Sequence, residues 1–278
     1  MTNDDRPPTD DEADGGDTNG PPRFRPAPPI GDAVGGGGPR PLNLRVPLLD
    51  DEPVPQVRWT IALRLLLVIP QAIVLIFVGI AAFFVGVVGW FAALFTGELP
   101  EGVRSFLVMV VRWSTRVGAY FYLLTDTYPA FNGDDDPSYP IGVEIPDGVR
   151  LNQMAVLFRL FLSIPAYLMN SLISGGMGVL LLPIWICALV LGRLPGPLYR
   201  VVATSTRYSA RCVGYFLMLT PEYPWGWKGD DPGVSPSSDE SSAAGLTRFD
   251  FHLTGWSQAW IWIFIVLGLF TSRRGRIY

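Results

Sequence analysis

Arginines recur in pairs inside segments that are otherwise apolar, and they are the side chains of this sequence best suited to bind something. Arg112 and Arg116 are four residues apart, and Arg207 and Arg211 repeat this spacing, so each pair lies on one face of a helix. Arg200 lies within about 40° of the second pair on a helix that turns about 100° per residue. A guanidinium is always charged and presents a planar fork of donors that fits phosphate and carboxylate oxygens. The chemistry that this pattern offers is binding of an anionic group.

Three interpretations of these arginines are open. They contact lipid phosphates from an interfacial helix, they pair with carbonyls and aromatic faces of a neighbouring helix and stabilise the fold, or they line a polar path for an anionic solute. A charge at the centre of a bilayer costs about 2.5 to 3.5 kcal/mol or more, so each interpretation provides a partner. The only acids inside the helical units are Glu98 and Glu101, at a turn, which favours lipid head groups over ion pairs. The candidate lipid or anion contacts are Arg64, Arg112, Arg116, Arg159, Arg200, Arg207 and Arg211.

No other residues indicate catalysis or metal binding. His252 is the single histidine, and Cys187 and Cys212 lie in apolar segments without a Cys-x-x-Cys motif, so we expect buried cysteines and no zinc site. The carboxylates of segments 131–137 and 227–232 could hold calcium, but they lack the ligand order of a calcium loop and are typical of tight turns. We therefore expect no catalytic residue, no metal and no cofactor, and a protein that is not an enzyme.

The distribution of charge excludes an ordinary soluble protein. Mean hydropathy is +0.29, and segments 65–95, 160–192 and 253–272 contain no charged residue. Apolar runs of 18 or more residues are long enough to cross a hydrocarbon core of about 30 Å. A net charge of −4 and a pI near 5.0 give no support for nucleic acid as a partner. The composition predicts an integral membrane protein.

The sequence contains an internal repeat. Shifting the chain by 95 residues aligns segment 64–129 with 159–224 without a gap and gives 20 identities in 66 positions. The identities include prolines, glycines and arginines as well as leucines, so a shared apolar composition does not explain them. The clearest pairs are Arg64/Arg159, Pro70/Pro165, Trp90/Trp185, Gly97/Gly192, Arg112/Arg207, Arg116/Arg211, Tyr120/Tyr215 and Pro129/Pro224.

Each copy is expected to contain a long apolar helix, a Gly-x-Leu-Pro turn and a second helix. The long helices start near Arg64 and Arg159, and the second helices cover about 103–125 and 198–220. Alternating segments 41–46, 139–145 and 246–253 predict three short strands that could pair as a small sheet on one membrane face. The expected organisation is a disordered leader 1–40, repeats 41–137 and 138–232, a flexible linker 233–245, and a strand with a terminal transmembrane helix and basic tail in 246–278.

The motif string of the first copy resembles a bacterial membrane family catalogued only as a domain of unknown function, number 4389. The matching residues are Arg58, Trp59, Arg64, Ile69 and Pro70, the segment 90–100, then Arg112, Trp113 and Arg116, and the segment 124–129. The second copy keeps Arg159, Pro165, Trp185 and the turn 192–195, but it has Leu189-Val190-Leu191-Gly192 in place of Leu-Phe-Thr-Gly and Tyr208 in place of Trp113. The resemblance implies a small helical membrane domain and supplies no activity, substrate or catalytic residue.

The fold class we expect is an all-α integral membrane protein with two tandem two-helix units, a terminal transmembrane helix, and short β-strands on one membrane face. Copies that each cross an even number of times would point the same way, about a pseudo-two-fold axis along the membrane normal. We expect a multi-pass protein of the bacterial plasma membrane with a cytoplasmic N-terminus. The expected function is a non-enzymatic scaffold or accessory subunit that binds anionic lipid, with a protein partner at the strand-bearing face. The alternative is a small transporter or channel component with a path between the repeats.

Overall fold

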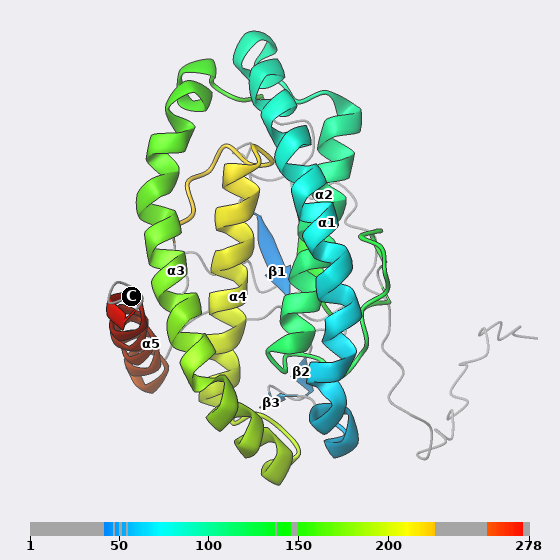
Figure 1. The fold of residues 1–278 in the computed structure, drawn as a ribbon, viewed down its shortest axis with the longest axis vertical. Helices are drawn as coiled ribbons and strands as arrows, with labels where there is room; N and C mark the ends of the chain where they lie inside the picture. The colour runs from blue at the N-terminus through cyan, green and yellow to red at the C-terminus, as the bar shows by residue number, and fades with distance from the viewer. Residues whose placement is uncertain are drawn as a thin grey trace, which may run out of the picture.

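The described part of the chain is a helical bundle with a few short strands (Figure 1). The computed structural model describes residues 42–46, 48–49, 52–53, 55–136, 138–145, 150–225 and 255–274. The predicted leader 1–40 and linker 233–245 lie outside these ranges, and so does the third predicted strand, 246–253. The helices are α1 Arg58–Thr96, α2 Glu101–Phe121, α3 Gln153–Leu191, α4 Gly196–Phe216 and α5 Gly255–Arg274; the strands are β1 Asn43–Arg45, β2 Leu48–Leu49, β3 Glu52–Pro53 and β4 Gly142–Glu144.

The two copies form the same pair of helices, as the repeat predicts. Each copy has a 39-residue helix followed by a 21-residue helix. The long helices end at Gly97 and Gly192, whose φ values of 75° and 73° are in the left-handed region that favours glycine. The N–H groups of these glycines donate to the carbonyls of Ala93 and Ala188 and close the last turn. The turn geometry is therefore duplicated together with the sequence.

Contacts between the copies are reciprocal, which places the copies about a pseudo-two-fold axis. The N–H of Gln56 donates to the Gly192 carbonyl at 2.8 Å, and the N–H of Leu151, its equivalent 95 residues later, donates to the Gly97 carbonyl at the same distance. This exchange of equivalent contacts is the property of a two-fold interface. A second reciprocal pair joins Arg58 Nη2 to the Val190 carbonyl at 3.2 Å and Gln153 Nε2 to the Phe95 carbonyl at 2.9 Å.

These contacts also show that α1 and α3 run in opposite directions, because the start of each helix meets the end of the other (Figure 1). If both long helices crossed a membrane, the copies would therefore point opposite ways and not, as predicted, the same way. The prediction assumed that every second helix returns across the membrane. The structure instead reverses the second copy by passing the chain through β4 before α3 begins.

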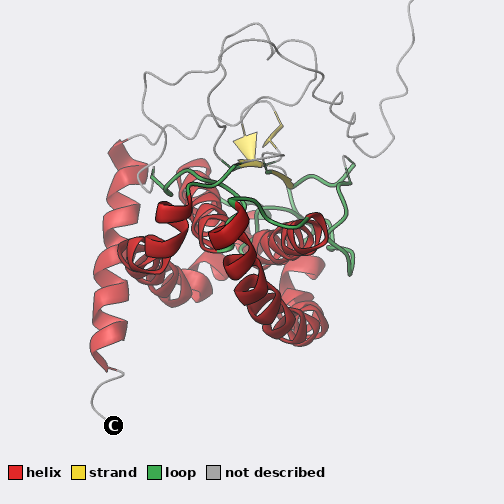
Figure 2. Cartoon of the chain, turned by 90° about the horizontal axis from the view of Figure 1, so that it is seen from above, coloured by secondary structure: helices red, strands yellow, loops and turns green. Residues whose placement is uncertain are grey.

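Two short antiparallel strand pairs lie along one side of the helices (Figure 2). β1 pairs with β4, with Leu44 opposite Val143 at the centre, and β2 pairs with β3. The apolar residues Leu44 and Val143 are buried, as the alternation predicts for a strand with one face on a core. β1 contacts α4 and β4 contacts α2, so each strand covers the second helix of the other copy. Within the described ranges the predicted three-stranded sheet is reduced to this central pair.

Exposed apolar side chains gather on α1 and α3. In the described ranges, 17 large apolar side chains of α1 and 15 of α3 are exposed, against none on α2 and two on α4. The short helices α2 and α4 are mostly buried, since they lie between the long helices and the strands (Figure 1). Both α1 and α3 are long and apolar enough to cross a membrane. The molecule thus has an apolar side formed by α1 and α3 and a strand-bearing side opposite it.

Helix α5 runs across the other helices instead of along them (Figure 2). It packs on α3 through two glycines at which the backbones touch. A Cβ atom added at Gly176 would lie 1.9 Å from the Phe264 carbonyl oxygen, and one at Gly268 would lie 2.1 Å from that of Leu172. Only glycine permits such an approach, which is a common device where helices pack inside membranes.

Candidate functional site

Arg64 forms a buried clamp between α1 and the chain that follows α2. The side chain has no exposed surface, and its guanidinium carbon lies 4.3 Å from the centre of the Tyr120 ring. Nη1 donates to the Tyr120 carbonyl at 2.8 Å and Nη2 donates to Asp126 Oδ1 at 2.9 Å. Asp126 also accepts a hydrogen bond from the Thr60 hydroxyl. This charge therefore has a carboxylate, a carbonyl and an aromatic face as partners.

Arg159 repeats the clamp without the carboxylate. Its guanidinium carbon lies 4.2 Å from the centre of the Tyr215 ring, and Nη2 donates to the Thr220 carbonyl at 2.7 Å. The position equivalent to Asp126 is Pro221. Nε and Nη1 of Arg159 have no hydrogen-bond partner among the described residues. The second copy therefore buries a cation with fewer compensating contacts than the first.

The backbone after each short helix makes these clamps possible. Leu123 and Met218, equivalent residues, have φ values of 66° and 62°. The following N–H of Leu124 donates to the Ala119 carbonyl, which completes a helix-ending motif with a left-handed residue. The chain then turns back toward α1, so Asp126 reaches Arg64 although the two are 62 positions apart. The second helices for this reason end about four residues before the predicted limits.

Arginines of the short helices hold the strand-bearing side. On α2, Arg112 donates through Nε to the Val143 carbonyl at 3.5 Å and through Nη2 to Asp135 Oδ2 at 3.1 Å. The buried Arg116 lies 5.0 Å from the centre of the Tyr139 ring. These side chains fasten α2 to β4 and to the segments that lead into it.

The equivalent pair on α4 acts on the other strand. Arg211 donates through Nε to the carbonyl of Leu42 at 2.8 Å, next to β1, and through Nη1 to that of Trp225 at 3.3 Å. Arg207 is completely buried, and Arg200, near the start of α4, is half-buried. The arginine stripes of both short helices therefore face the core and the strand layer.

The loop between α2 and β4 carries exposed carboxylates. Asp134, Asp135 and Asp136 are exposed, and hydrogen bonds from the Ser138 hydroxyl and N–H hold the pKa of Asp136 below its ordinary value. Burial raises the pKa of Tyr139, whose ring covers Arg116. Within the described ranges no three His, Cys, Asp or Glu side chains are grouped as metal ligands. His252 and segment 227–232 lie outside those ranges.

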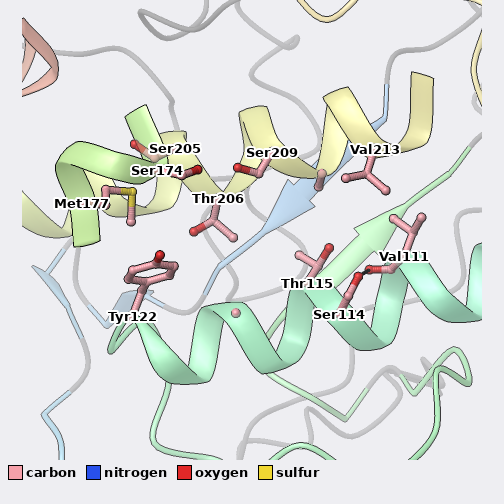
Figure 3. A pocket seen from close by; sticks show the side chains of 12 residues that line it. Val111, Ser114, Thr115, Tyr122, Ser174, Met177, Ser205, Thr206, Ser209 and Val213 are labelled. Carbon is pink, nitrogen blue, oxygen red and sulfur yellow. Dashed lines mark hydrogen bonds between the residues drawn. The ribbon is translucent and has the colours of Figure 1, made fainter. Parts of the chain in front are cut away.

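A small cavity lies between the two copies. Its volume is about 130 Å³, and it is lined by side chains of α2 and α4 together with Ser174 and Met177 of α3 (Figure 3). The lining includes Ser114 and Ser209, which are equivalent in the repeat, so the cavity is close to the pseudo-two-fold axis. The hydroxyls in its lining belong to Ser114, Thr115, Tyr122, Ser174, Ser205, Thr206 and Ser209.

Several of these hydroxyls donate their hydrogen to a helix carbonyl. Ser205 donates to Val201 at 2.8 Å and Thr206 to Val202 at 2.9 Å. A hydroxyl has one hydrogen and two lone pairs, so each of these oxygens is left as an acceptor. The described lining contains no charged side chain. The cavity thus suits water or a small neutral donor more than an anion.

The comparisons with known proteins identify the family and nothing more specific. The family model described as Domain of unknown function (DUF4389) matches the chain twice, over residues 58–132 and 153–228. The chain belongs to this family. The two matches coincide with the two helical units, so the tandem arrangement predicted from the repeat is confirmed. Comparison with curated proteins and with solved structures finds no match.

The structure changes the interpretation of the candidate arginines in this DUF4389 protein. Arg64, Arg116, Arg159 and Arg207 are at most 3% exposed, so these side chains have no surface to offer to lipid head groups. The contacts of Arg64, Arg116 and Arg159 with aromatic rings, and of Arg64 and Arg159 with carbonyls, are those of the second interpretation, in which such contacts stabilise the fold. The expectation that these arginines lack carboxylate partners was wrong for Arg112 and Arg64, because Asp135 and Asp126 lie in the chain after α2 and not inside a helix.

Some residues that make buried polar or aromatic contacts were missed in the sequence. Tyr120 and Tyr215 are matched positions of the repeat, so the internal alignment contained the signal for both clamps. Gln71 gave none, because the second copy has Ala166 there. Gln71 is nevertheless completely buried; its Nε2 donates to the Pro129 carbonyl at 2.6 Å, and its Oε1 accepts from Trp113 Nε1 at 2.9 Å.

Proposed function

We propose that this protein is a non-enzymatic, multi-pass membrane scaffold or accessory subunit of the bacterial plasma membrane. The observation that carries the proposal is the apolar side formed by α1 and α3. Side chains such as Leu66, Phe77 and Leu182 are 65 to 70% exposed, and water contact costs about 25 cal/mol for each Å² of apolar surface. Acyl chains remove this cost for a surface of this size. The fold has no arrangement of polar groups, in its described part, that we can assign to catalysis.

We propose that anionic lipid binds to those of the candidate arginines that keep some surface. These are Arg112, Arg200 and Arg211, at the strand-bearing side and at the start of α4. Lipid phosphates at the interface are natural partners for such guanidinium groups. A protein partner would dock on the strand-bearing side, where exposed carboxylates and strands are presented.

A purified-protein experiment tests the lipid proposal. Native mass spectrometry from detergent should detect retained anionic phospholipid, and the triple variant Arg112→Gln, Arg200→Gln and Arg211→Gln should retain at least tenfold less. Arg150→Gln is the matched control, because Arg150 is exposed and pairs with Glu98 away from these positions. Equal retention by the triple variant and the control would refute lipid binding at these arginines.

A second candidate function is a small transporter or channel component. The cavity between α2 and α4 favours it, because the cavity lies between the copies and has hydroxyl acceptors in its lining. The expected solute is small and neutral. Proteoliposomes that take up glycerol and urea no faster than empty vesicles would eliminate this candidate, while faster uptake that Ser209→Phe abolishes would support it.

A further inference from the structure

Four features of the bundle bear on how its helices are oriented relative to a bilayer. First, α1 and α3 are too long for a simple crossing. Each has 39 residues, which at 1.5 Å per residue is about 58 Å, whereas the hydrocarbon core is about 30 Å thick. Neither helix matches the membrane if it stands upright.

Second, α5 has the length that a crossing needs, and it runs across the other helices. Its 20 residues span about 30 Å. Because α5 runs across the direction of the other helices in Figure 2, α5 and the long helices cannot both be perpendicular to the membrane. If α5 crosses the bilayer, the long helices lie along it.

Third, polar groups lie beside the middle of the helices, and not only at their ends, on the strand-bearing side. Arg112 is near the middle of α2, and it binds Asp135 beside the exposed Asp134 and Asp136. Upright helices would place these carboxylates and the short strands at the depth of the acyl chains. Exposed irregular backbone and exposed carboxylates do not occur there unless they line water.

Fourth, the exposed apolar side chains and these polar groups lie on opposite sides of the bundle, and not at opposite ends of the helices. They lie on α1 and α3 over most of their length, from Leu63 to Phe95 and from Met154 to Leu191. The strands and most loops lie on the opposite side (Figure 2). A membrane boundary that respects this division runs parallel to the long helices.

We propose that α1 to α4 lie along the membrane plane with α1 and α3 in contact with lipid acyl chains, while α5 crosses the bilayer. This inference rests on the proposed membrane location and specifies its geometry. The strand layer then faces the head groups and water on one side. The pseudo-two-fold axis stands perpendicular to the membrane, and the C-terminal end of α5 lies on the far side, with the basic residues Arg273, Arg274 and Arg276 close to it in sequence.

The position of the two turns distinguishes this geometry from upright helices. The turns after α1 and α3 contain the exposed residues Glu98 and Arg193. Because α1 and α3 are antiparallel, upright helices would put these residues on opposite membrane faces. Helices lying along the membrane put both on the face that carries Asp135.

Single-cysteine labelling measures this directly. The background is Cys187→Ser with Cys212→Ala, and the variants are Glu98→Cys, Arg193→Cys and Asp135→Cys, each reconstituted in sealed vesicles of phosphatidylcholine and phosphatidylglycerol. The probe is a membrane-impermeant maleimide added outside, then again after detergent. In each preparation, the fraction labelled from outside should agree within about twofold for all three positions.

Different outcomes would overturn the in-plane geometry and the membrane location. Complementary labelling of Glu98→Cys and Arg193→Cys, one outside and one inside, would overturn the in-plane geometry and favour upright helices whose strand side lines water. Failure of the background protein to float with vesicles in a density gradient would overturn the membrane location itself. Retention of the wild-type melting temperature by each variant shows that labelling reports on the native fold.

Discussion

At the scale of single residues, the two arginine clamps are a natural comparison of a paired and an unpaired buried cation. Arg64 and Arg159 occupy equivalent positions and lie over equivalent tyrosines at 4.3 and 4.2 Å. Only Arg64 has a carboxylate partner, Asp126. Removing one partner of a buried pair is costly, whereas removing a buried charge that lacks a counter-ion also removes its desolvation cost. The two arginines should therefore respond differently to the same substitution.

Arg64→Met is expected to destabilise the protein by about 3 kcal/mol, because it leaves the Asp126 carboxylate without its cation. Arg159→Met should cost less than half as much. The measurement is the free energy of unfolding in detergent, followed by tryptophan fluorescence against denaturant. Equal losses for the two variants would contradict the assignment of Asp126 as the main difference between the clamps.

Restoring the missing carboxylate in the second copy is the converse test. Pro221→Asp places a carboxylate where the first copy has Asp126, so it should stabilise the protein by about 1 kcal/mol through a partly buried, charge-assisted contact. Pro221→Asn has nearly the same shape without the charge and is the control. The increase in melting temperature should appear for the aspartate and disappear when Arg159→Met is added. An increase that survives in the double variant would assign the effect to loss of the proline.

At the scale of the elements, the sequence predicted which helices form better than where they start and how their side chains are directed. The 95-residue period predicted both helix pairs, and Gly97 and Gly192 marked their turns correctly. Hydropathy could not predict that the long helices start at Arg58 and Gln153, because polar contacts outside the apolar runs mark those ends: Asn152 caps α3, and Gln56, just before α1, pairs with the other copy. Nor could it predict the inward direction of the arginines, since Arg64 finds Asp126 only after the chain has turned back.

The contact of α5 with α3 can be tested at one glycine of α3, and a second glycine of the same helix serves as the control. Gly176→Ala is expected to force the helices apart, because its Cβ would overlap the Phe264 carbonyl. Gly178, two residues along α3, has open space around it. The Ala variant at 176 should destabilise by about 2 kcal/mol, within the range for overpacking, while the Ala variant at 178 should be neutral or slightly stabilising. Protease protection of α5 in vesicles would report the loss, and equal protection in both variants would contradict the close contact.

At the scale of the whole molecule, reciprocity explains why the copies are interlocked. Each copy donates a backbone N–H to the turn glycine of the other, and each contributes one strand to the central pair β1–β4. An antiparallel pair has two-fold symmetry of its own, so the strands continue the symmetry of the helices. Equivalent elements therefore share a side of the molecule: α1 and α3 lie on one side, and the strands lie on the other. A helix count taken from hydropathy contains no information on which elements share a side.

The proposed position of the long helices along the membrane can be measured as the depth of their side chains in the bilayer. Spin labels at Leu66, Phe77 and Phe91, exposed side chains spaced along α1, measure depth through the ratio of accessibility to oxygen and to a water-soluble nickel chelate. These positions span 25 residues, or about 38 Å, more than the thickness of the hydrocarbon core. If α1 lies along the membrane, all three positions should have similar depth. A depth that peaks at Phe77 and falls to the aqueous value at Leu66 and Phe91 would show that α1 crosses the membrane and would contradict the proposed position.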